Sequence, residues 1–184
     1  MPRYYIPKND FKVVELEEIK PYINQASTTE LKVLIALIWL TGARIGDIIR
    51  LKKVHFVIRN EFKDIQIIIK ASKFGGIGIP TFGFNDPFIS DLIIPYLESI
   101  LTDIPFTHGK RRYQQLLQEL NKKIHGDDKT KWVTFHYFRH SRLSWLGQHE
   151  AMPEDFKSWT GHRSGAFEDY FKARRTEKFK GMIK

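Results

Sequence analysis

The chain has 184 residues, a formal net charge of +9 and no cysteine. A chain of this length is expected to form one domain, with a core large enough to fold without a disulfide or a structural metal. The lack of cysteine excludes disulfide frameworks, thiolate metal sites and cysteine nucleophiles. No apolar run has the roughly 18 residues of a membrane span, and the amino terminus has no signal-peptide core, so we expect a cytoplasmic protein without a membrane partner.

The excess of positive charge predicts a polyanionic partner, because lysine and arginine neutralise phosphates and release counterions. Most of the dense basic clusters lie in the second half of the chain. The alternative is a solvated surface that only keeps the protein soluble. We expect nucleic acid to be the partner. The basic residues expected to contact it are Lys70, Lys110, Arg111, Arg112, Lys122, Lys123 and Lys131.

The first part of the chain predicts three helical segments after an irregular arm at residues 1–11. Residues 27–30 read Ser-Thr-Thr-Glu, a capping box in which the serine and the glutamate satisfy each other's exposed amide donors. Apolar residues then recur at helical spacing until Gly42 interrupts the pattern. The expected helices span residues 15–24, limited by Pro21, then 28–40 and 43–51.

The remainder predicts a small sheet followed by more helices, so the fold class is α+β and mainly α. Three segments rich in β-branched residues, 54–59, 64–70 and 77–80, are separated by turns and predict a three-stranded antiparallel sheet. We expect one domain over residues 1–184, with a carboxy-terminal helix or tail at 171–184. The later expected helices span 89–101 with Pro95 at a bend or a helix start, 108–124, 134–148, 152–159 and 165–178.

Arg44 is the first candidate for phosphate chemistry. Gly42 allows a tight turn before a new helix, and the amino terminus of a helix favours anions. A guanidinium can bind two phosphate oxygens at once, and Asp47, three residues on, is expected to hold Arg44 in place. The alternative is an ordinary surface ion pair on a helix.

Lys73 lies in a glycine-rich turn at the expected tip of a hairpin. A lysine there has reach, and it can donate a proton when nearby cations lower its pKa. Lys70 competes for this role from the preceding strand. The alternative is a charged hairpin tip without a function.

His136 and Arg139 stand three residues apart and are expected on one face of a helix. An arginine that neutralises an oxyanion beside a histidine that moves a proton suits phosphate chemistry. His136 and His140 also have a metal-binding spacing, but zinc helices of this type usually carry a glutamate where Tyr137 stands. We therefore expect no metal. A core histidine bonded to a backbone carbonyl is the other alternative.

His162 follows Gly161 in an expected turn, and Tyr170 comes eight residues later on the last helix. Tyrosine is a poor nucleophile at neutral pH because its usual pKa is about 10. Neighbouring arginines and a bound phosphate would have to activate it. The alternative for Tyr170 is packing against the core beside Phe167 and Phe171.

Together these motifs resemble the catalytic domain of tyrosine recombinases (phage-type integrases). The resemblance covers about residues 12–178 and implies metal-independent and cofactor-independent cleavage and rejoining of DNA strands. It implies that Tyr170 attacks the scissile phosphate to give a 3′-phosphotyrosyl link and a free 5′-hydroxyl. The residues that carry the resemblance are Thr41-Gly42-Ala43-Arg44-Ile45-Gly46-Asp47, Lys73, His136-Tyr137-Phe138-Arg139-His140, Gly161-His162 and Tyr170.

The resemblance also implies roles for the other site residues. Arg44 and Arg139 would stabilise the charge of the transition state, and Lys73 would protonate the leaving 5′-oxygen. His136 would accept or relay the tyrosine proton, and His162 would bond a non-bridging oxygen.

The resemblance further implies double-stranded DNA as the partner of a protein that is a monomer in solution and a tetramer on DNA. The protein would then be nucleoid-associated when bound to DNA, and it could belong to a mobile element. The residues before the first helix are too few for the family's separate DNA-clamping domain, so we expect that domain to be absent or removed.

Three other functions stay open at this point. One is topoisomerase-like cleavage and resealing, which uses the same chemistry. Another is an inactive DNA-binding module with the same fold. A metal-dependent nuclease is the least supported, because the site lacks acidic clusters that could hold magnesium.

Overall fold

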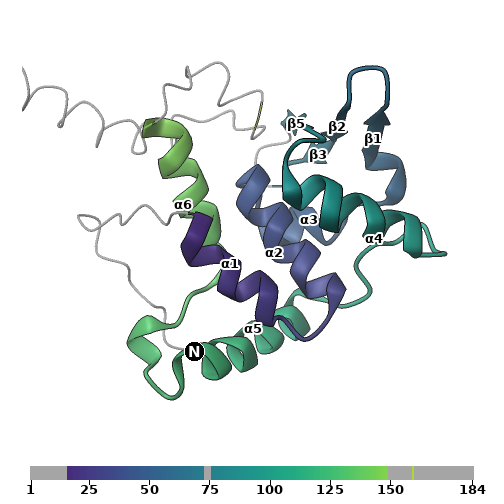
Figure 1. Ribbon diagram of the computed structural model, residues 1–184. Helices are drawn as coiled ribbons and strands as arrows, with labels where there is room; N and C mark the ends of the chain where they lie inside the picture. Colours follow the sequence, from purple (N-terminus) through teal and green to yellow (C-terminus); the bar gives the residue numbers. More distant parts are fainter. Residues whose placement is uncertain (1–15, 73–75, 149–158, 160–184) are drawn as a thin grey trace, which may run out of the picture.

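The computed structural model describes residues 16–72, 76–148 and 159, and Figure 1 draws them as ribbon. Helix α2 lies in the centre and contacts α1, α3, α4 and α6. The strands gather at one end of the molecule, while α5 runs along the opposite side (Figure 1). The elements are α1 Leu16–Gln25, α2 Thr29–Thr41, α3 Ile45–Ile48, η1 Lys53–His55, β1 Phe56–Arg59, β2 Asp64–Ile67, β3 Ile69–Lys70, β4 Ile77–Gly78, β5 Thr81–Gly83, η2 Ile89–Ile93, α4 Ile94–Ser99, α5 Lys110–His125, η3 Lys129–Lys131 and α6 Phe135–Gln148.

The central helix α2 is buried on every side, as a helix that is apolar all round must be. From Leu31 to Thr41 every residue except Lys32 is buried. Burial of one such leucine or isoleucine side chain contributes about 1.5–3 kcal/mol to stability. The expected helix at 28–40 is therefore confirmed, and it forms the middle of the core.

A capping box between Ser27 and Glu30 was expected at the start of α2, and this prediction is wrong. The N-cap is Thr28, whose Oγ1 accepts the Leu31 N–H at 3.2 Å. The Glu30 carboxylate reaches away from the helix end instead. It accepts the Thr107 N–H at 2.7 Å and the hydroxyl of Tyr113. Glu30 thus bonds the start of α2 to the segment that leads into α5.

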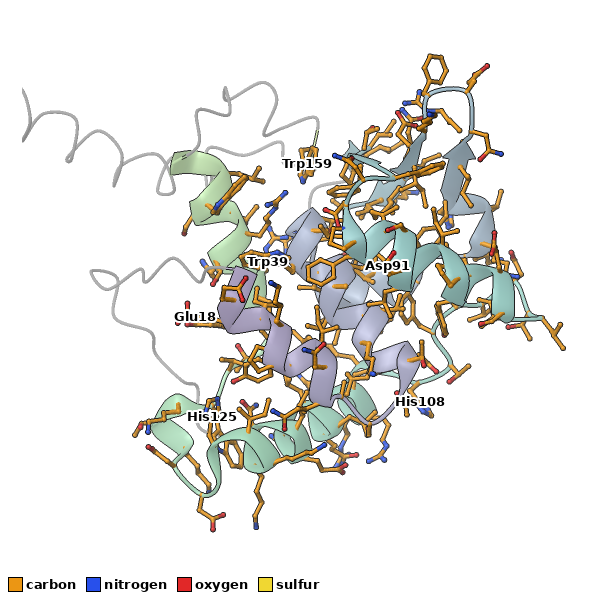
Figure 2. All side chains as sticks on the ribbon, in the orientation of Figure 1. Glu18, Trp39, Asp91, His108, His125 and Trp159 are labelled. Carbon is orange, nitrogen blue, oxygen red and sulfur yellow. The ribbon has the colours of Figure 1, made fainter. Side chains whose placement is uncertain are left out.

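Helix α1 continues through Pro21 to Gln25, although Pro21 was expected to limit it. A proline inside a helix removes one backbone hydrogen bond. Burial offsets this cost, because Ile19 and Tyr22 face the core on either side of the proline. The Tyr22 hydroxyl lies 2.6 Å from Nε2 of His125, at the end of α5 farthest from His108 (Figure 2).

The three-stranded antiparallel sheet is confirmed, but two of its strands differ from the prediction. The strand order is β1-β2-β5, so the third strand is Thr81–Gly83 and not residues 77–80. The expected strand 64–70 is divided into β2 and β3 at Ile68, whose N–H donates to the His55 carbonyl at 2.8 Å. Strand β3 then pairs with β4 as a separate two-stranded ladder.

The remaining helices follow the sequence pattern, with two exceptions. Helices α5 and α6 begin and end within two residues of the expected bounds. The expected helix at 89–101 is instead a π-helix, η2, followed by α4 with Pro95 in its first turn. The expected helix at 43–51 shrinks to α3. Apart from Trp159, the helices expected at 152–159 and 165–178 lie outside the described residues.

Within the ranges that the structure describes, no helix has the length and apolar character needed to cross a membrane.

Candidate active site

The end of α2 turns sharply at Gly42 and delivers Arg44 to the start of α3. Gly42 has φ of 62°, a left-handed conformation that glycine adopts without strain, and its N–H bonds the Ile38 carbonyl at 2.9 Å. A Cβ at this position would lie 2.8 Å from Cδ2 of Leu143. Arg44 is extended at the N-cap of α3 and is partly buried. The turn that the sequence predicted at Gly42 is present.

Two arginines of α6 bond the last carbonyls of α2. Arg139 is 5% exposed, and its Nη1 donates to the Gly42 carbonyl. One turn further on, Nε of Arg142 donates to the Leu40 carbonyl at 3.1 Å. Cations are favourable at the carboxyl end of a helix, where carbonyls lack partners within the helix. These bonds fix α6 against the turn that carries Arg44.

The entry to α6 is held by a buried asparagine that we did not predict. Asn121 is 1% exposed, and its side chain bonds the Val133 N–H at 2.8 Å and the Val133 carbonyl at 2.9 Å. The sequence feature that could have predicted its burial is its position on the apolar face of α5, four residues after Leu117. Asn121 thus holds the backbone at Val133, two residues before α6 begins and three before His136.

His136 faces three positively charged side chains from three elements. Partial burial lowers the pKa of His136, and the charges of Arg139, Arg44 and Lys110 lower it further. Arg139 lies three residues after His136 on α6, and its bond to the Gly42 carbonyl brings it next to the turn that carries Arg44. The imidazole is accordingly neutral near pH 7, the form that can accept a proton.

His140 lies directly against His136. Their Nε2 atoms are 2.5 Å apart, and the two rings meet edge to face at 4.1 Å between centroids. Burial lowers the pKa of His140 to about 4, with further contributions from His136 and Arg139. Among the described residues no cluster of three or more metal-ligating side chains occurs.

Asp47 bonds a different arginine from the one that the sequence suggested. Its carboxylate is 3% exposed and pairs with Arg50 at 2.6 Å, not with Arg44. The second partner of this carboxylate is the Ser72 N–H, at 3.2 Å. Lys73 itself lies outside the described residues. The residue before it is nevertheless bonded to α3, three residues from Arg44.

His162 and Tyr170 lie outside the described residues. Trp159 is the nearest described residue to them in sequence. It packs against Phe82 of β5 with ring centroids 5.0 Å apart, and it stands beside the sheet in Figure 2. The Arg142 guanidinium lies 6.0 Å from the Trp159 ring centroid.

All of the basic residues expected to contact nucleic acid are exposed, from Lys70 on β3 to Lys131 on η3. Three of them form ion pairs at the surface. Lys122 lies 3.4 Å from Asp127, Lys131 lies 3.3 Å from Asp128, and Arg112 lies 3.3 Å from Glu119. Such exposed pairs contribute about 0–1 kcal/mol, so a phosphate can replace the carboxylate at little cost.

The known proteins that are similar to this chain in sequence or in fold are recombinases and integrases. The sequence is 32% identical over 165 residues to tyrosine recombinase XerC of Rickettsia massiliae, covering 84% of this chain and 51% of that protein. The XerH site-specific recombinase bound to its difH substrate has a TM-score of 0.66 at 19% identity, over 89% of this chain and 51% of that chain. The Tn1549 transposon integrase in complex with circular intermediate DNA has a TM-score of 0.65 at 14% identity, over 97% and 67%. No protein-family profile matches the sequence.

The structural similarity identifies the fold, and the sequence similarity identifies the related family. The mainly helical α+β arrangement with its small antiparallel sheet is the catalytic fold of tyrosine recombinases. In sequence the chain is similar to the tyrosine recombinase family, over the part that has this catalytic fold. It spans about half the length of the curated relatives that it matches.

Proposed function

We propose that the chain is the catalytic part of a site-specific DNA recombinase or integrase. It cleaves and rejoins DNA strands through a 3′-phosphotyrosyl intermediate and needs no metal. The observation that carries this proposal is the bond from buried Arg139, three residues after His136, to the Gly42 carbonyl, two residues before Arg44. Two guanidiniums beside a proton acceptor suit attack on a phosphodiester.

The two arginines act on the phosphate. Guanidiniums bind phosphate oxygens in pairs, and fixed positive charge is most effective where negative charge develops in the transition state. Arg139 is well suited to this role because burial and its bond to Gly42 hold it in place before DNA arrives. Arg44 approaches from α3, so the phosphate lies between two elements.

Proton transfers complete the proposed reaction. Tyr170 attacks phosphorus and passes its proton to His136, while Lys73 protonates the 5′-oxygen that leaves. His162 bonds a non-bridging oxygen. The bond between Asp47 and the Ser72 N–H supports the role of Lys73, because it holds the base of the hairpin beside α3. The phosphotyrosyl bond keeps the energy of the phosphodiester, so a second 5′-hydroxyl can reseal the strand.

A covalent trap tests this function. The protein and a Tyr170→Phe variant are mixed with nicked DNA in a metal chelator and separated on a denaturing gel. We expect a protease-sensitive protein–DNA adduct from the wild type only, because the phenyl ring has no oxygen to attack phosphorus. An adduct that persists in Tyr170→Phe would mean that another residue is the nucleophile. Intact binding without any adduct would favour the inactive DNA-binding module.

The exposed basic residues are proposed to contact the DNA backbone. Replacing Arg111 and Arg112 with alanine should weaken binding and reduce the slope of log affinity against log salt by about 0.9 for each lost phosphate contact. The matched control is the Lys20→Ala/Lys52→Ala variant, which removes two exposed charges from the first half of the chain. We expect little change in its slope. Equal losses in both variants would indicate general attraction instead of specific contacts.

Assembly on DNA is part of the proposal. The XerH and Tn1549 structures contain those proteins bound to DNA, which supports duplex DNA as the partner here. We propose a monomer that assembles into a tetramer on two paired sites, with integration or excision of a mobile element as the outcome. A topoisomerase-like enzyme would relax supercoiled DNA without a paired site, and this difference separates the two reactions.

A further inference from the structure

His136 and His140 form a hydrogen-bonded pair that phosphate chemistry alone does not require. They occupy positions four residues apart on α6, and their Nε2 atoms lie 2.5 Å apart. Each neutral imidazole has one N–H donor and one acceptor nitrogen. One Nε2 must therefore carry the hydrogen and the other must accept it. Each ring consequently determines the tautomer of its neighbour.

The charged groups around the pair restrict how many protons it can hold. Arg139 of α6, Arg44 at the start of α3 and Lys110 at the start of α5 face His136. Arg139 also faces His140. A second added proton would place two imidazolium ions in contact beside these cations, which is strongly unfavourable. Near neutral pH the pair therefore takes up one proton at most as a unit.

We propose that His140 is the positioning residue for His136. It accepts the Nε2–H of His136, fixes the orientation of that ring and leaves Nδ1 of His136 as the nitrogen that accepts a proton. The role in catalysis rests on the proposed function, whereas the hydrogen-bonded pair itself does not.

The proton balance of the step follows from this arrangement. The O–H bond of Tyr170 breaks and an Nδ1–H bond forms on His136, while the tyrosine oxygen bonds phosphorus. The P–O5′ bond breaks and Lys73 supplies the proton for the leaving oxygen. His136 then carries a positive charge, and its Nε2–H still donates to neutral His140. This charge-assisted bond stabilises His136 only after it has accepted the proton.

The first test observes the pair directly in the full chain without DNA. Long-range ¹⁵N–¹H spectra of the histidine rings distinguish protonated from unprotonated nitrogens. We expect Nε2–H on His136 and an unprotonated Nε2 on His140 near pH 7.5. In His140→Leu, His136 should lose its fixed tautomer and titrate at lower pH, because its cationic form loses an acceptor beside Arg139. Unchanged His136 signals in that variant would overturn the proposal.

The second test measures the rate of adduct formation on nicked DNA against pH. His140→Leu should be slower by about 10-fold, the low end of the losses known for partners that orient metal-binding histidines. Its acidic limb should move to lower pH. His140→Gln, whose side-chain oxygen can accept the same hydrogen, should recover most of the rate, and a melting curve establishes that both variants fold.

The outcomes separate this inference from the proposed function. If the wild type forms no adduct but the spectra show the pair, then the function fails and the pair stands. If the wild type forms the adduct, and His140→Leu matches it in rate and in pH profile, then His140 does not position His136.

Discussion

Replacing Gly42 with alanine is expected to lower the free energy of unfolding by about 2–5 kcal/mol. Alanine in the left-handed region costs about 1–2 kcal/mol. Its Cβ would also lie 2.8 Å from Cδ2 of Leu143, a fully buried side chain, and overpacking of this kind costs about 1–3 kcal/mol. Chemical denaturation of both proteins measures the difference. Adduct formation should fall as well, because the Gly42 carbonyl holds Arg139.

Gly46→Ala is the matched control for this variant. Its Cβ would meet only Nη1 of Arg50, at 3.8 Å, so no neighbour has to move. Alanine is also favoured over glycine inside a helix, so this change should be neutral or slightly stabilising. Combining Gly42→Ala with Leu143→Ala should cost less than the sum of the two, because the smaller side chain removes the overlap. Additive costs would show that Leu143 is not the obstacle.

Replacing Arg139 with lysine should reduce the rate of adduct formation by about 10²–10³-fold, the loss typical of removing one preorganised group that stabilises transition-state charge. Lysine keeps the charge but lacks the planar fork that binds a phosphate and a carbonyl together. Duplex binding should change far less, because many exposed basic residues contribute to it. Single-turnover rates and binding isotherms separate these two quantities.

Arg142→Lys is the control for this experiment. Arg142 stands three residues further on the same helix and bonds the Leu40 carbonyl, with its guanidinium 4.6 Å from the Trp145 ring centroid. This change should lower stability by about 1 kcal/mol, the typical net contribution of a hydrogen bond, and leave the rate of cleavage nearly unchanged. If both variants lose activity equally, Arg139 acts through packing and not on the phosphate.

The sequence predicted those parts of the fold that depend on local pattern. Helices α2, α5 and α6 follow from apolar residues at helical spacing, and the turn at Gly42 follows from the need for a left-handed residue. The same patterns predicted His136 and Arg139 on one helix. Their proximity to Arg44 came only from the resemblance to the family, because the two segments lie more than 90 residues apart in sequence.

The errors arise where a long-range hydrogen bond decides the structure. The third strand of the sheet is set by its pairing with β2, in which Ile65 lies opposite Phe82. Glu30 fits a capping box by spacing, yet it bonds groups far along the chain. Asn121 carried no recognisable motif, because its partners are backbone atoms of Val133. Local propensity contains no information about such partners.

Helix α2 is bonded to other elements at both of its ends. Glu30 joins its first turn to the segment before α5, and the Gly42 carbonyl joins its end to Arg139. One inserted residue would rotate everything beyond it by about 100° and shift it by about 1.5 Å. The bonds of Glu30 and the bond between Gly42 and Arg139 could then no longer form at the same time. In this chain α2 must therefore keep a constant number of residues between its two anchoring contacts, a constraint that does not apply to the surface loops.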